Sequence, residues 1–309
     1  MDSDAPLETD EAKIEEIGEV QGQESEAPDA LPPGLRDLTA RIAQITRSLH
    51  AKWGIYIRCI ETGEEIALGA DEIMDTMSVI KIPLMAEVFR QAEAGKFSLS
   101  DRLTLKASDK RPGTGVIRML DDGAVLTIGD LITLMINVSD NSATDMLFAQ
   151  VGGVDPVNAL MHRYGLSTIK ATGTADDWFQ ALRREPDAWK FHVEGKHPFG
   201  LSSARDTGKL LASIVQGEVV SEVACRQMMG ALRSQLYRTR LPRYVDNFMI
   251  AHKTGDFLPY IGNDVGIIEL PSCRVVVCVF TAHHNGKGVL LEDAIGRIAE
   301  QVSYYFISR

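Results

Sequence analysis

Apolar residues recur at helical spacing in several stretches of the chain. Leu38, Ile42, Ile45 and Leu49 are three or four positions apart, which predicts an amphipathic helix over 34–50. A second helix is predicted from Ser78, with Pro83 in its first turns, where proline is tolerated. Patterns of the same kind predict the remaining helices at 131–138 (after a capping sequence at Thr127), 141–151, 154–164, 203–216, 221–233 and 288–306.

Other stretches are rich in β-branched and aromatic residues, which is typical of strands. Residues 52–60 and 65–68 flank the turn Glu61-Thr62-Gly63-Glu64 and predict a hairpin. Near the C-terminus, Gly, Asn, Pro and Ser separate three further strands, at 248–252, 265–270 and 274–281.

The order of these elements is helix, two strands, a block of helices, three strands and a helix. It predicts an α/β (α+β) fold, in which the terminal helices pack against one five-stranded antiparallel sheet and the middle block forms an all-helical lobe. The α/β lobe would comprise about 34–75 and 217–309, and the helical lobe about 76–216. A cleft between two such lobes is a natural place for a functional site.

The charge is unevenly distributed. Residues 1–33 hold eleven acids and one base, whereas the rest of the chain holds 32 acids and 31 bases. The leader has no aromatic residue, so we expect it to be disordered, as a solvating tail or a segment that binds a partner. The nearly neutral remainder has no basic stripe, which argues against a nucleic-acid partner.

Two further absences guide the interpretation. No run approaches the ~20 apolar residues of a membrane span, and no basic segment followed by an apolar one marks an export signal. We therefore expect no membrane partner and a cytoplasmic location. Cys59, Cys225, Cys273 and Cys278 lack paired spacing, so they predict buried free thiols and no metal site.

The first candidate for chemistry is Ser78-Val79-Ile80-Lys81, at the predicted start of a helix. Positions three apart share a helix face, so the Lys81 amine can reach the Ser78 hydroxyl. A serine needs a base to become a good nucleophile, and a buried lysine near other cations can lose its proton near neutral pH. By itself the motif is weak, because serine is also a common helix cap.

The second candidate is Ser139-Asp140-Asn141, in a short loop between two helices. Ser139 could pass a proton to the leaving group, and Asn141 could bind substrate or hold Lys81. Asp140 is better suited to bracing the loop. This tripeptide alone is most simply interpreted as another helix cap.

The third is Lys253-Thr254-Gly255, at the predicted end of a strand. Lys253 would bring positive charge to the site, Thr254 could bind a substrate carboxylate or carbonyl, and Gly255 lets another backbone approach closely. The backbone N–H groups of Asp256 and Ser78 could together stabilise an oxyanion. In isolation this motif carries little information.

Together, in this order and in these contexts, the three motifs closely resemble the class A β-lactamase-like serine hydrolases, a superfamily that includes penicillin-binding proteins. The resemblance extends over about 35–308. It implies the α/β fold with a helical lobe, and acylation of Ser78 by an ester, amide or lactam without cofactor or metal. The stretches that carry it are Ser78–Pro83, Val138–Thr144, Arg240–Pro242, Ala251–Gly255 and Asn263–Ile267.

One family feature is missing. Class A enzymes carry Glu-x-x-Leu-Asn between the second and third motifs, and its glutamate activates the water that releases the acyl group. Residues 168–174 read Thr-Ile-Lys-Ala-Thr-Gly-Thr, and no such motif follows. Glu185, in Arg-Glu-Pro-Asp, is a candidate deacylation base, although a surface acid is the simpler interpretation. Asp176 and Asp177 are weaker candidates.

Residues 174–199 include Trp178, Phe179, Trp189 and Phe191. These aromatic side chains could form a lid over an apolar acyl pocket, or could pack the segment against the helical lobe. Both alternatives remain open at this point.

Three further positions invite a functional interpretation. Arg238 lies four positions before the proline of Arg-Leu-Pro, where some family members place an arginine that binds a carboxylate. His252 precedes Lys253, but strand alternation directs it to the opposite side, which favours a structural role. The pair His283-His284 is treated in the same way.

The sequence therefore leaves three functional hypotheses. The first is an esterase or amidase that acts on a small metabolite, and the second is a working β-lactamase. The third is a penicillin-binding protein that is acylated but does not turn over. The route of acyl release, the substrate and the oligomeric state stay open.

Overall fold

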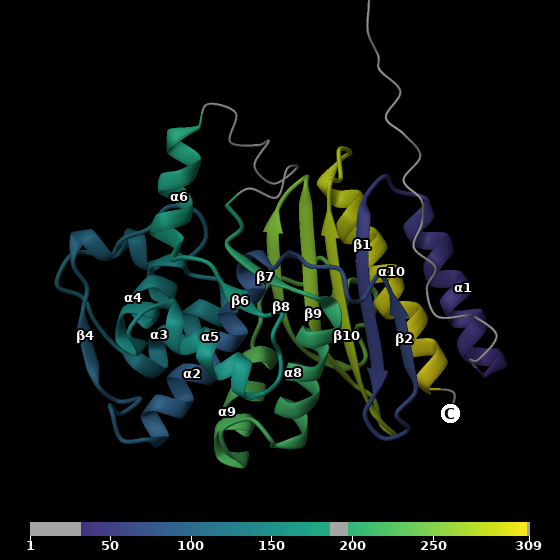
Figure 1. Cartoon of the computed structure of the whole chain (residues 1–309), viewed down its shortest axis with the longest axis horizontal. Helices are drawn as coiled ribbons and strands as arrows, with labels where there is room; N and C mark the ends of the chain where they lie inside the picture. Colours follow the sequence, from purple (N-terminus) through teal and green to yellow (C-terminus); the bar gives the residue numbers. More distant parts are fainter. Residues whose placement is uncertain (1–31, 186–196, 308–309) are drawn as a thin grey trace, which may run out of the picture.

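The computed structural model describes residues 32–185 and 197–307 (Figure 1). Its largest sheet has five strands in the order β2-β1-β10-β9-β8, and all neighbouring pairs are antiparallel. This confirms the predicted sheet and leaves β2 and β8 at its edges. The strands are β1 (Lys52–Cys59), β2 (Glu65–Leu68), β8 (Met249–Phe257), β9 (Ile261–Glu269) and β10 (Arg274–Ala282).

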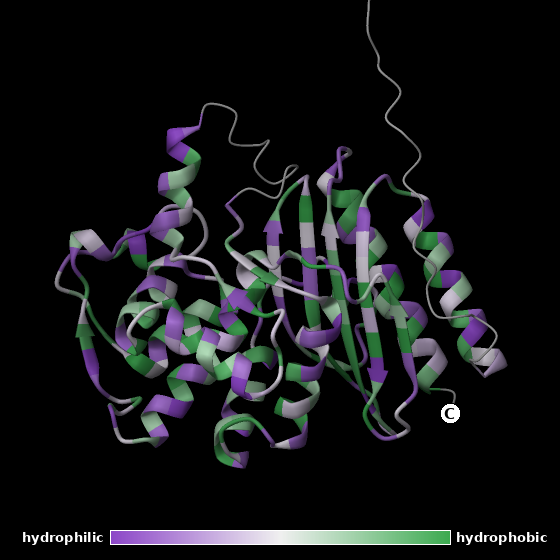
Figure 2. Ribbon diagram, in the orientation of Figure 1, coloured by the Kyte–Doolittle hydropathy of each residue, from purple (hydrophilic) through white to green (hydrophobic). Residues whose placement is uncertain are grey.

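The terminal helices α1 (Pro33–Arg47) and α10 (Gly288–Ile307) cover one face of this sheet (Figure 1). Figure 2 shows hydrophobic and hydrophilic residues alternating along α1, as expected of an amphipathic helix. Strand alternation directs Ile55 and Ile57 of β1 to this face, where they join a buried apolar cluster with both helices. Burial of these apolar surfaces is the main force that holds the two helices on the sheet.

The opposite face of the sheet receives α8 (Ala204–Gln216). Tyr56, between Ile55 and Ile57, points to this face. A Cβ atom at Gly208 of α8 would lie 2.2 Å from the Tyr56 ring, so only glycine permits this close packing.

Beyond α8 lies the helical part of the molecule, built around α2 (Lys81–Glu93). Ten of the 13 residues of α2 are buried, which marks a helix enclosed on nearly all sides. This enclosure places Lys81 in the protein core. The helices packed around α2 are α3 (Ile128–Asn137), α4 (Asn141–Val151), α5 (Val154–Arg163) and α9 (Glu222–Arg233).

Several short elements complete the described chain. Two small sheets have the strand orders β3-β7-β6 and β4-β5. Their strands are β3 (Met74–Asp75), β4 (Arg102–Thr104), β5 (Val125–Thr127), β6 (Lys170–Ala171) and β7 (Gly200–Ser202). The 3-10 turns are η2 (Met77–Ile80), η3 (Ala107–Asp109), η4 (Ile117–Met119) and η5 (Leu241–Tyr244).

Three local predictions need correction. The helix expected from Ser78 starts as the 3-10 turn η2 and becomes α-helical at Lys81. Strand β8 continues beyond 252 through the Lys-Thr-Gly motif, and β9 begins at Ile261. Both strands are longer because their pairing extends across Gly255, which is opposite Asn263.

The third correction is the helix α6 (Ala175–Arg184), which the sequence analysis missed. Thr174 caps it by accepting a hydrogen bond from the backbone N–H of Asp177, and the Asp177 side chain reciprocates. Trp178, Phe179 and Leu182 follow at spacings of three and four along one side. A capping box followed by this periodicity was the available signal.

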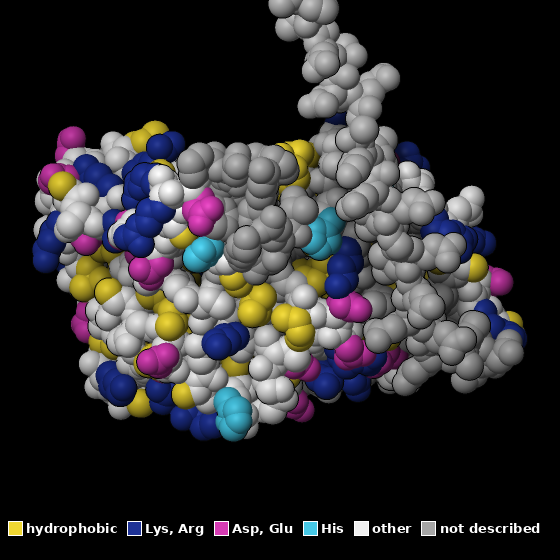
Figure 3. Space-filling view, turned by 45° about the horizontal axis from the view of Figure 1, so that its top comes forward, with side chains coloured by type: hydrophobic (Ala, Val, Ile, Leu, Met, Phe, Trp, Pro, Cys, Tyr) yellow, Lys and Arg dark blue, Asp and Glu magenta, His cyan; other side chains and the backbone are white. Residues whose placement is uncertain are grey.

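The remaining structural predictions concern the chain ends, the cysteines and the surface. Nearly all of the acidic leader lies outside the described residues. All four cysteines are buried free thiols, as predicted. Within the described ranges, no helix is both long and apolar enough to cross a bilayer. On the face in Figure 3, basic and acidic side chains of the described residues are interspersed.

Candidate active site

Ser78 sits in the tight turn η2, where the sheet meets the helical part. Met77 has a φ of 46°, a left-handed conformation that is uncommon for a residue with a side chain. Ser78 is partly exposed, whereas both of its neighbours are buried. This turn therefore presents the serine hydroxyl while its flanking side chains anchor it in the core.

Strand β8 lies directly against this turn. A Cβ atom on Gly255 would be 2.4 Å from the carbonyl oxygen of Thr76 and 3.0 Å from the backbone nitrogen of Ser78. Glycine is therefore required for the two backbones to approach so closely. Since β8 is an edge strand, its outer side carries backbone groups that no other strand of the sheet pairs.

Lys81 is completely buried behind the turn. Its Nζ atom donates to the Ser139 carbonyl oxygen at 2.7 Å, to Ser139 Oγ at 3.0 Å and to Asn141 Oδ1 at 2.9 Å. Burial, and next the nearby charge of Lys253, hold the pKa of Lys81 well below its usual value. In the described part of the chain no hydrogen bond links Lys81 Nζ to Ser78 Oγ. Two of the three hydrogen bonds given above for Lys81 Nζ are to Ser139, so the first motif contacts the second mainly through that residue.

Lys253 is also completely buried and approaches Ser139 from the other side. Its Nζ atom is 3.1 Å from Ser139 Oγ and donates to the carbonyl oxygen of Thr254 at 2.8 Å. Burial lowers the pKa of Lys253 to about 7, against the opposing pull of Asp256 and Asp264. The Ser139 hydroxyl thus bridges two amines that release protons easily.

The loop that carries Ser139 is firmly held. Ser139 has a φ of 55°, and Asp140 accepts backbone hydrogen bonds from Val116 at 2.6 Å, from Ile117 at 2.8 Å and from Ala143 at 3.0 Å. Asp140 therefore braces the loop, as its position in the motif suggested. Ser139 lies in the short loop between α3 and α4. In its left-handed conformation, the side chain contacts both lysines.

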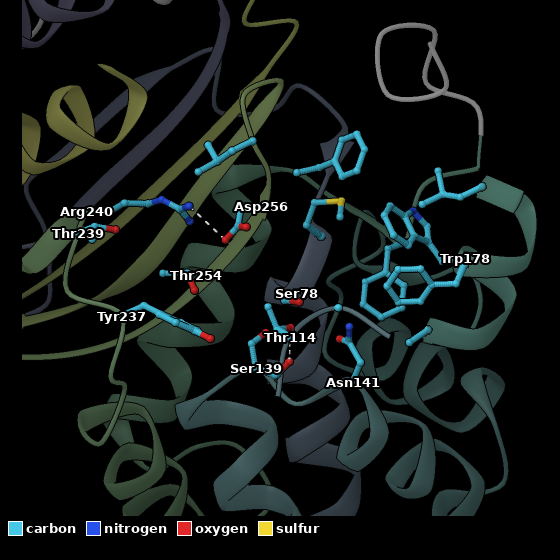
Figure 4. A pocket seen from close by; sticks show the side chains of 18 of the residues that line it. Ser78, Thr114, Ser139, Asn141, Trp178, Tyr237, Thr239, Arg240, Thr254 and Asp256 are labelled. Carbon is cyan, nitrogen blue, oxygen red and sulfur yellow. Dashed lines mark hydrogen bonds and ion pairs between the residues drawn. The ribbon is translucent and has the colours of Figure 1, made fainter. Parts of the chain in front are cut away.

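A cavity of about 500 Å³ opens in front of Ser78. Figure 4 shows its two contrasting sides, with Trp178 on one and Thr254, Asp256 and Arg240 on the other. The apolar residues that line the cavity are Met77, Ala175, Trp178, Phe179, Leu182, Phe199, Phe257 and Leu258. The polar residues that line it are Ser78, Thr114, Ser139, Asn141, Tyr237, Thr239, Arg240, Thr254, Asp256 and Glu292.

The arginine beside this cavity is not the expected one. Arg238 is exposed and is absent from the lining, whereas Arg240 is 3% exposed and lines it. The guanidinium of Arg240 lies 3.1 Å from Asp256 and 3.6 Å from Glu292, and donates to the Asn263 carbonyl oxygen at 2.9 Å. The turn that follows, η5, directs Arg240 inward and leaves Arg238 in solvent.

The apolar side depends on α6. Asp145 of α4 holds the start of this helix, because its carboxylate accepts from the backbone N–H of Ala175 at 2.7 Å and of Asp176 at 2.9 Å. The same carboxylate pairs with Arg111 at 2.6 Å. Burial raises the pKa of Asp145 despite these partners.

The two described aromatic residues of this segment, Trp178 and Phe179, line the cavity, and their helix α6 also contacts α4 of the helical part. Trp178 lines the cavity and also packs edge-on against Phe179 and against Phe257 of β8, with ring centroids 5.0 and 5.7 Å apart. The helix therefore shapes the cavity and packs across to the sheet at once. Trp189 and Phe191 lie outside the described residues.

The candidate deacylation acids lie elsewhere. Glu185 is exposed at the end of α6, in a separate surface hollow with Asp177 and His197. Asp176 accepts from Gln180 at 2.6 Å, and Asp177 caps the helix. The structure brings none of these three carboxylates into the lining of the Ser78 cavity.

The histidines beside the third motif make structural contacts. His252 is buried, and its Nδ1 atom lies 2.9 Å from the carboxylate of Asp264, which also accepts from the backbone N–H of Leu241 at 3.0 Å. His284 contacts the carbonyl oxygen of Pro259 at 2.9 Å. These contacts agree with the structural interpretation of His252.

Among the described residues, one group has metal-ligand types close together, namely Cys59, Glu61 and Cys273, with ligand atoms within 4.8 Å. Both oxygens of Glu61 already accept hydrogen bonds from Arg274, at 2.7 and 2.8 Å. None of the three residues lines the Ser78 cavity.

Comparison with known proteins decides the family. The profile of the β-lactamase enzyme family matches residues 37–306. This chain belongs to the β-lactamase enzyme family. It is accordingly a serine hydrolase of the β-lactamase type.

Individual relatives are distant but cover nearly the whole domain. A β-lactamase of Mycobacterium tuberculosis is 29% identical over 282 residues, which are 89% of this chain and 86% of that protein. The crystal structure of a β-lactamase from Sphaerobacter thermophilus has a TM-score of 0.75 at 31% identity, covering 87% of this chain and 95% of that one. A PBP-A mutant, solved as an acyl-enzyme complex with penicillin G, has a TM-score of 0.74 at 24% identity and covers 90% and 100%.

Several lining residues carried no sequence signal. Thr114, Tyr237, Thr239 and Glu292 come from a loop, an inter-element segment and the first turns of α10. They reach the cavity through tertiary packing alone, so no local motif could have indicated them. Arg240 was noted only as part of a resembling stretch.

Proposed function

We propose that this β-lactamase-family protein forms an acyl-enzyme on Ser78 with esters, amides or lactams that carry a bulky apolar acyl group. One observation carries the proposal. The Ser139 hydroxyl lies between the buried amines of Lys81 and Lys253, at 3.0 and 3.1 Å, on the floor of the cavity that Ser78 enters. Such a cluster can take up and return protons near neutral pH.

In the acylation step, Ser78 Oγ attacks the substrate carbonyl carbon and Lys81, in its neutral form, accepts the serine proton. The lowered pKa of Lys81 supports this role, because it makes the neutral amine more available than that of an ordinary lysine. Ser139 passes a proton to the leaving oxygen or nitrogen as its bond to the carbonyl carbon breaks. Its contacts with both lysines support this relay.

The oxyanion formed on attack would be stabilised by the backbone N–H groups of Ser78 and Asp256. The close approach of Gly255 to the Ser78 turn supports this arrangement, since it brings both segments to one side of the reacting carbon. Thr254 would hold the substrate next to this pair, and Asn141 would keep Lys81 in position through its 2.9 Å hydrogen bond.

The nature of the cavity supports the choice of substrate. Eight of the lining residues are apolar, and Trp178 and its neighbours in α6 lie on one side, so an aryl or branched acyl group would bury apolar surface there, worth about 25 cal/mol per Å². An acetyl group would leave this side unfilled. We therefore expect a marked preference for phenylacetyl over acetyl substrates.

A second candidate function is acyl trapping without efficient turnover. The carboxylates among the lining residues are Asp256 and Glu292, and both are paired with Arg240. A paired carboxylate is a weaker base toward water than a free one. The PBP-A mutant, solved with penicillin G attached, is a distant structural relative in which an acyl group stays bound.

One experiment tests these alternatives. The protein is incubated with penicillin G and with an aryl phenylacetate, while released product and intact protein mass are followed. Ester turnover with inert penicillin supports an esterase, penicillin turnover supports a β-lactamase, and a stable adduct on Ser78 supports trapping. Equal activity of Ser78→Ala and the wild type in every assay would refute the proposal.

A further inference from the structure

The polar side of the cavity is set by alternate residues of one edge strand. Thr254 and Asp256 are two positions apart in β8, so both side chains point to the same face, and both line the Ser78 cavity. Figure 4 shows them next to each other, across the site from Trp178. A substrate whose acyl group lies against Trp178 would therefore direct its leaving group toward Thr254 and Asp256.

The charges on this side do not favour an anion. The positive charge of Arg240 is shared by two carboxylates, Asp256 at 3.1 Å and Glu292 at 3.6 Å. Another guanidinium nitrogen donates to the Asn263 carbonyl oxygen, and the side chain is 3% exposed. The three ionised groups sum to one negative charge, so this arginine has no net positive charge to offer a ligand.

Lys253 compensates for this only in part. Its Nζ atom is directed at Ser139 Oγ and at the Thr254 carbonyl oxygen, and Lys253 itself does not line the cavity. Burial lowers its pKa to about 7, so near neutral pH a large fraction of the molecules carry no charge there. The Asp256 side chain, in contrast, is 41% exposed and lines the cavity, on the side to which the leaving group would be directed.

We propose that Asp256, with Glu292, makes this subsite select leaving groups that are neutral or cationic and reject those that carry a carboxylate. The inference rests on the proposed acylation of Ser78. Two like charges in one partly enclosed site repel each other, and the effective dielectric there is lower than in water. Because Asp256 is partly exposed, the discrimination should be about tenfold at low salt and weaker at high salt.

The test uses three phenylacetate esters of meta-substituted phenols, bearing a carboxylate, a carboxamide or a trimethylammonium group. Each kcat/KM is divided by the rate of alkaline hydrolysis of the same ester, so that intrinsic reactivity cancels. For the wild-type protein we expect the normalised value to be lowest for the carboxylate ester, by about tenfold relative to the carboxamide. The trimethylammonium ester should match or exceed the carboxamide.

Two isosteric variants identify the cause. Asp256→Asn and Glu292→Gln should each raise the carboxylate-to-carboxamide ratio, Asp256→Asn by about tenfold, because the Arg240 charge is no longer neutralised. Asp122→Asn is the matched control. It removes the same charge from an exposed residue that pairs with Lys110 outside the cavity, and the ratio should stay within twofold of wild type.

The outcomes separate this inference from the proposed function. If hydrolysis depends on Ser78 but the carboxylate ester is favoured, or if both cavity variants leave the ratio unchanged, the charge selection is wrong and the acylation stands. If Ser78→Ala hydrolyses all three esters as fast as wild type, the proposed function fails, and the inference fails with it. An increase of the ratio in Asp122→Asn as large as that in Asp256→Asn would also overturn the inference.

Discussion

The two sides of the Ser78 cavity are held in different ways. On the polar side, Lys81, Ser139 and Lys253 are buried and linked by hydrogen bonds that join α2, the loop before α4 and β8. On the apolar side, α6 is appended to the core, where the carboxylate of Asp145 receives the backbone N–H groups at its start. The proposed reaction machinery is therefore part of the fold, whereas the acyl-binding side is an attachment to it.

This contrast teaches which properties can vary independently. A change on the polar side disturbs buried ionisable groups, so it should affect both chemistry and stability. A change in α6 should alter substrate preference with little effect on the bond-breaking step. Four predictions follow this division, beginning with the largest effect.

Replacement of Lys81 should have the largest effect. Lys81→Ala removes the proposed base, and we expect the rate of Ser78 acylation to fall by about 10³-fold, as is typical for loss of a general base. Intact-mass spectrometry at short times after mixing with an aryl phenylacetate measures this rate. Lys96→Ala, an exposed lysine just after α2, should react like wild type. A Lys81→Ala protein that is acylated at the wild-type rate would rule out this role.

The attachment of α6 can be broken at Asp145. Asp145→Ala leaves the partly buried Arg111 and two backbone N–H groups without their acceptor, so the free energy of unfolding should fall by about 2–3 kcal/mol. Urea denaturation measures the loss, and limited proteolysis should show earlier cleavage within 175–184. Asp121→Ala, at an exposed position, provides the control. Unaltered stability and protease resistance would show that α6 is held by other contacts.

The acyl preference can be reduced at Trp178. Trp178→Ala removes apolar surface from the cavity, and we expect kcat/KM for a phenylacetyl ester to fall by about tenfold relative to the acetyl ester of the same phenol. The acetyl ester serves as the internal reference, because both share one leaving group. If both esters lose activity equally, Trp178 supports the reaction rather than the selection of acyl groups.

The last prediction concerns pH, where the change in stability is spread over several pH units. The pKa of Lys253 is about 7 in the folded protein and near 10.4 in an unfolded chain, so between these values the unfolded state binds more protons. The free energy of unfolding should therefore rise with pH above about 7, by up to about 1.4 kcal/mol per unit from this group. Lys81, whose pKa is also lowered, adds to the same trend.

Urea unfolding between pH 6 and pH 10 measures this slope. Lys253→Met should flatten it relative to the wild type, because the variant has no such proton to release. A slope that is identical in both proteins would mean that Lys253 keeps an ordinary pKa in the fold. Distant groups that titrate in the same range cancel in this difference, whereas Lys81 contributes to it, because the charge of Lys253 helps to lower the pKa of Lys81.

Much of the fold could be predicted because the signals are local. The apolar periodicity of 34–50 and 288–306 and the β-rich stretches around them required no knowledge of tertiary contacts, and the five-stranded sheet followed from their order. The end of β8 was placed too early because a glycine in the sequence argues against a strand. In the structure, Gly255 lies within β8 and is required there by the close approach of Thr76. That requirement becomes visible only in three dimensions.

The same reasoning explains the candidate site. Ser78, Lys81, Ser139 and Lys253 were marked by short motifs. The structure brings Ser78 and Ser139 to one cavity and places both buried lysines in contact with Ser139. Arg240 could not be distinguished from Arg238 by sequence, since only the turn η5 decides which of the two faces inward. Glu292 was even harder to predict from the sequence, because its position in the cavity depends on how α10 crosses the sheet.

The placement of η2 against β8 has a consequence for how the protein meets its neighbours. An uncovered edge strand can template pairing with another chain and so begin aggregation. Here the nucleophile turn packs on the face of β8 at Gly255, since a Cβ atom there would point out of the sheet into Thr76, and among the described residues the outer edge of β8 has no partner strand. The strand edge beside the nucleophile is thus also the place where a second molecule could begin to pair with the sheet.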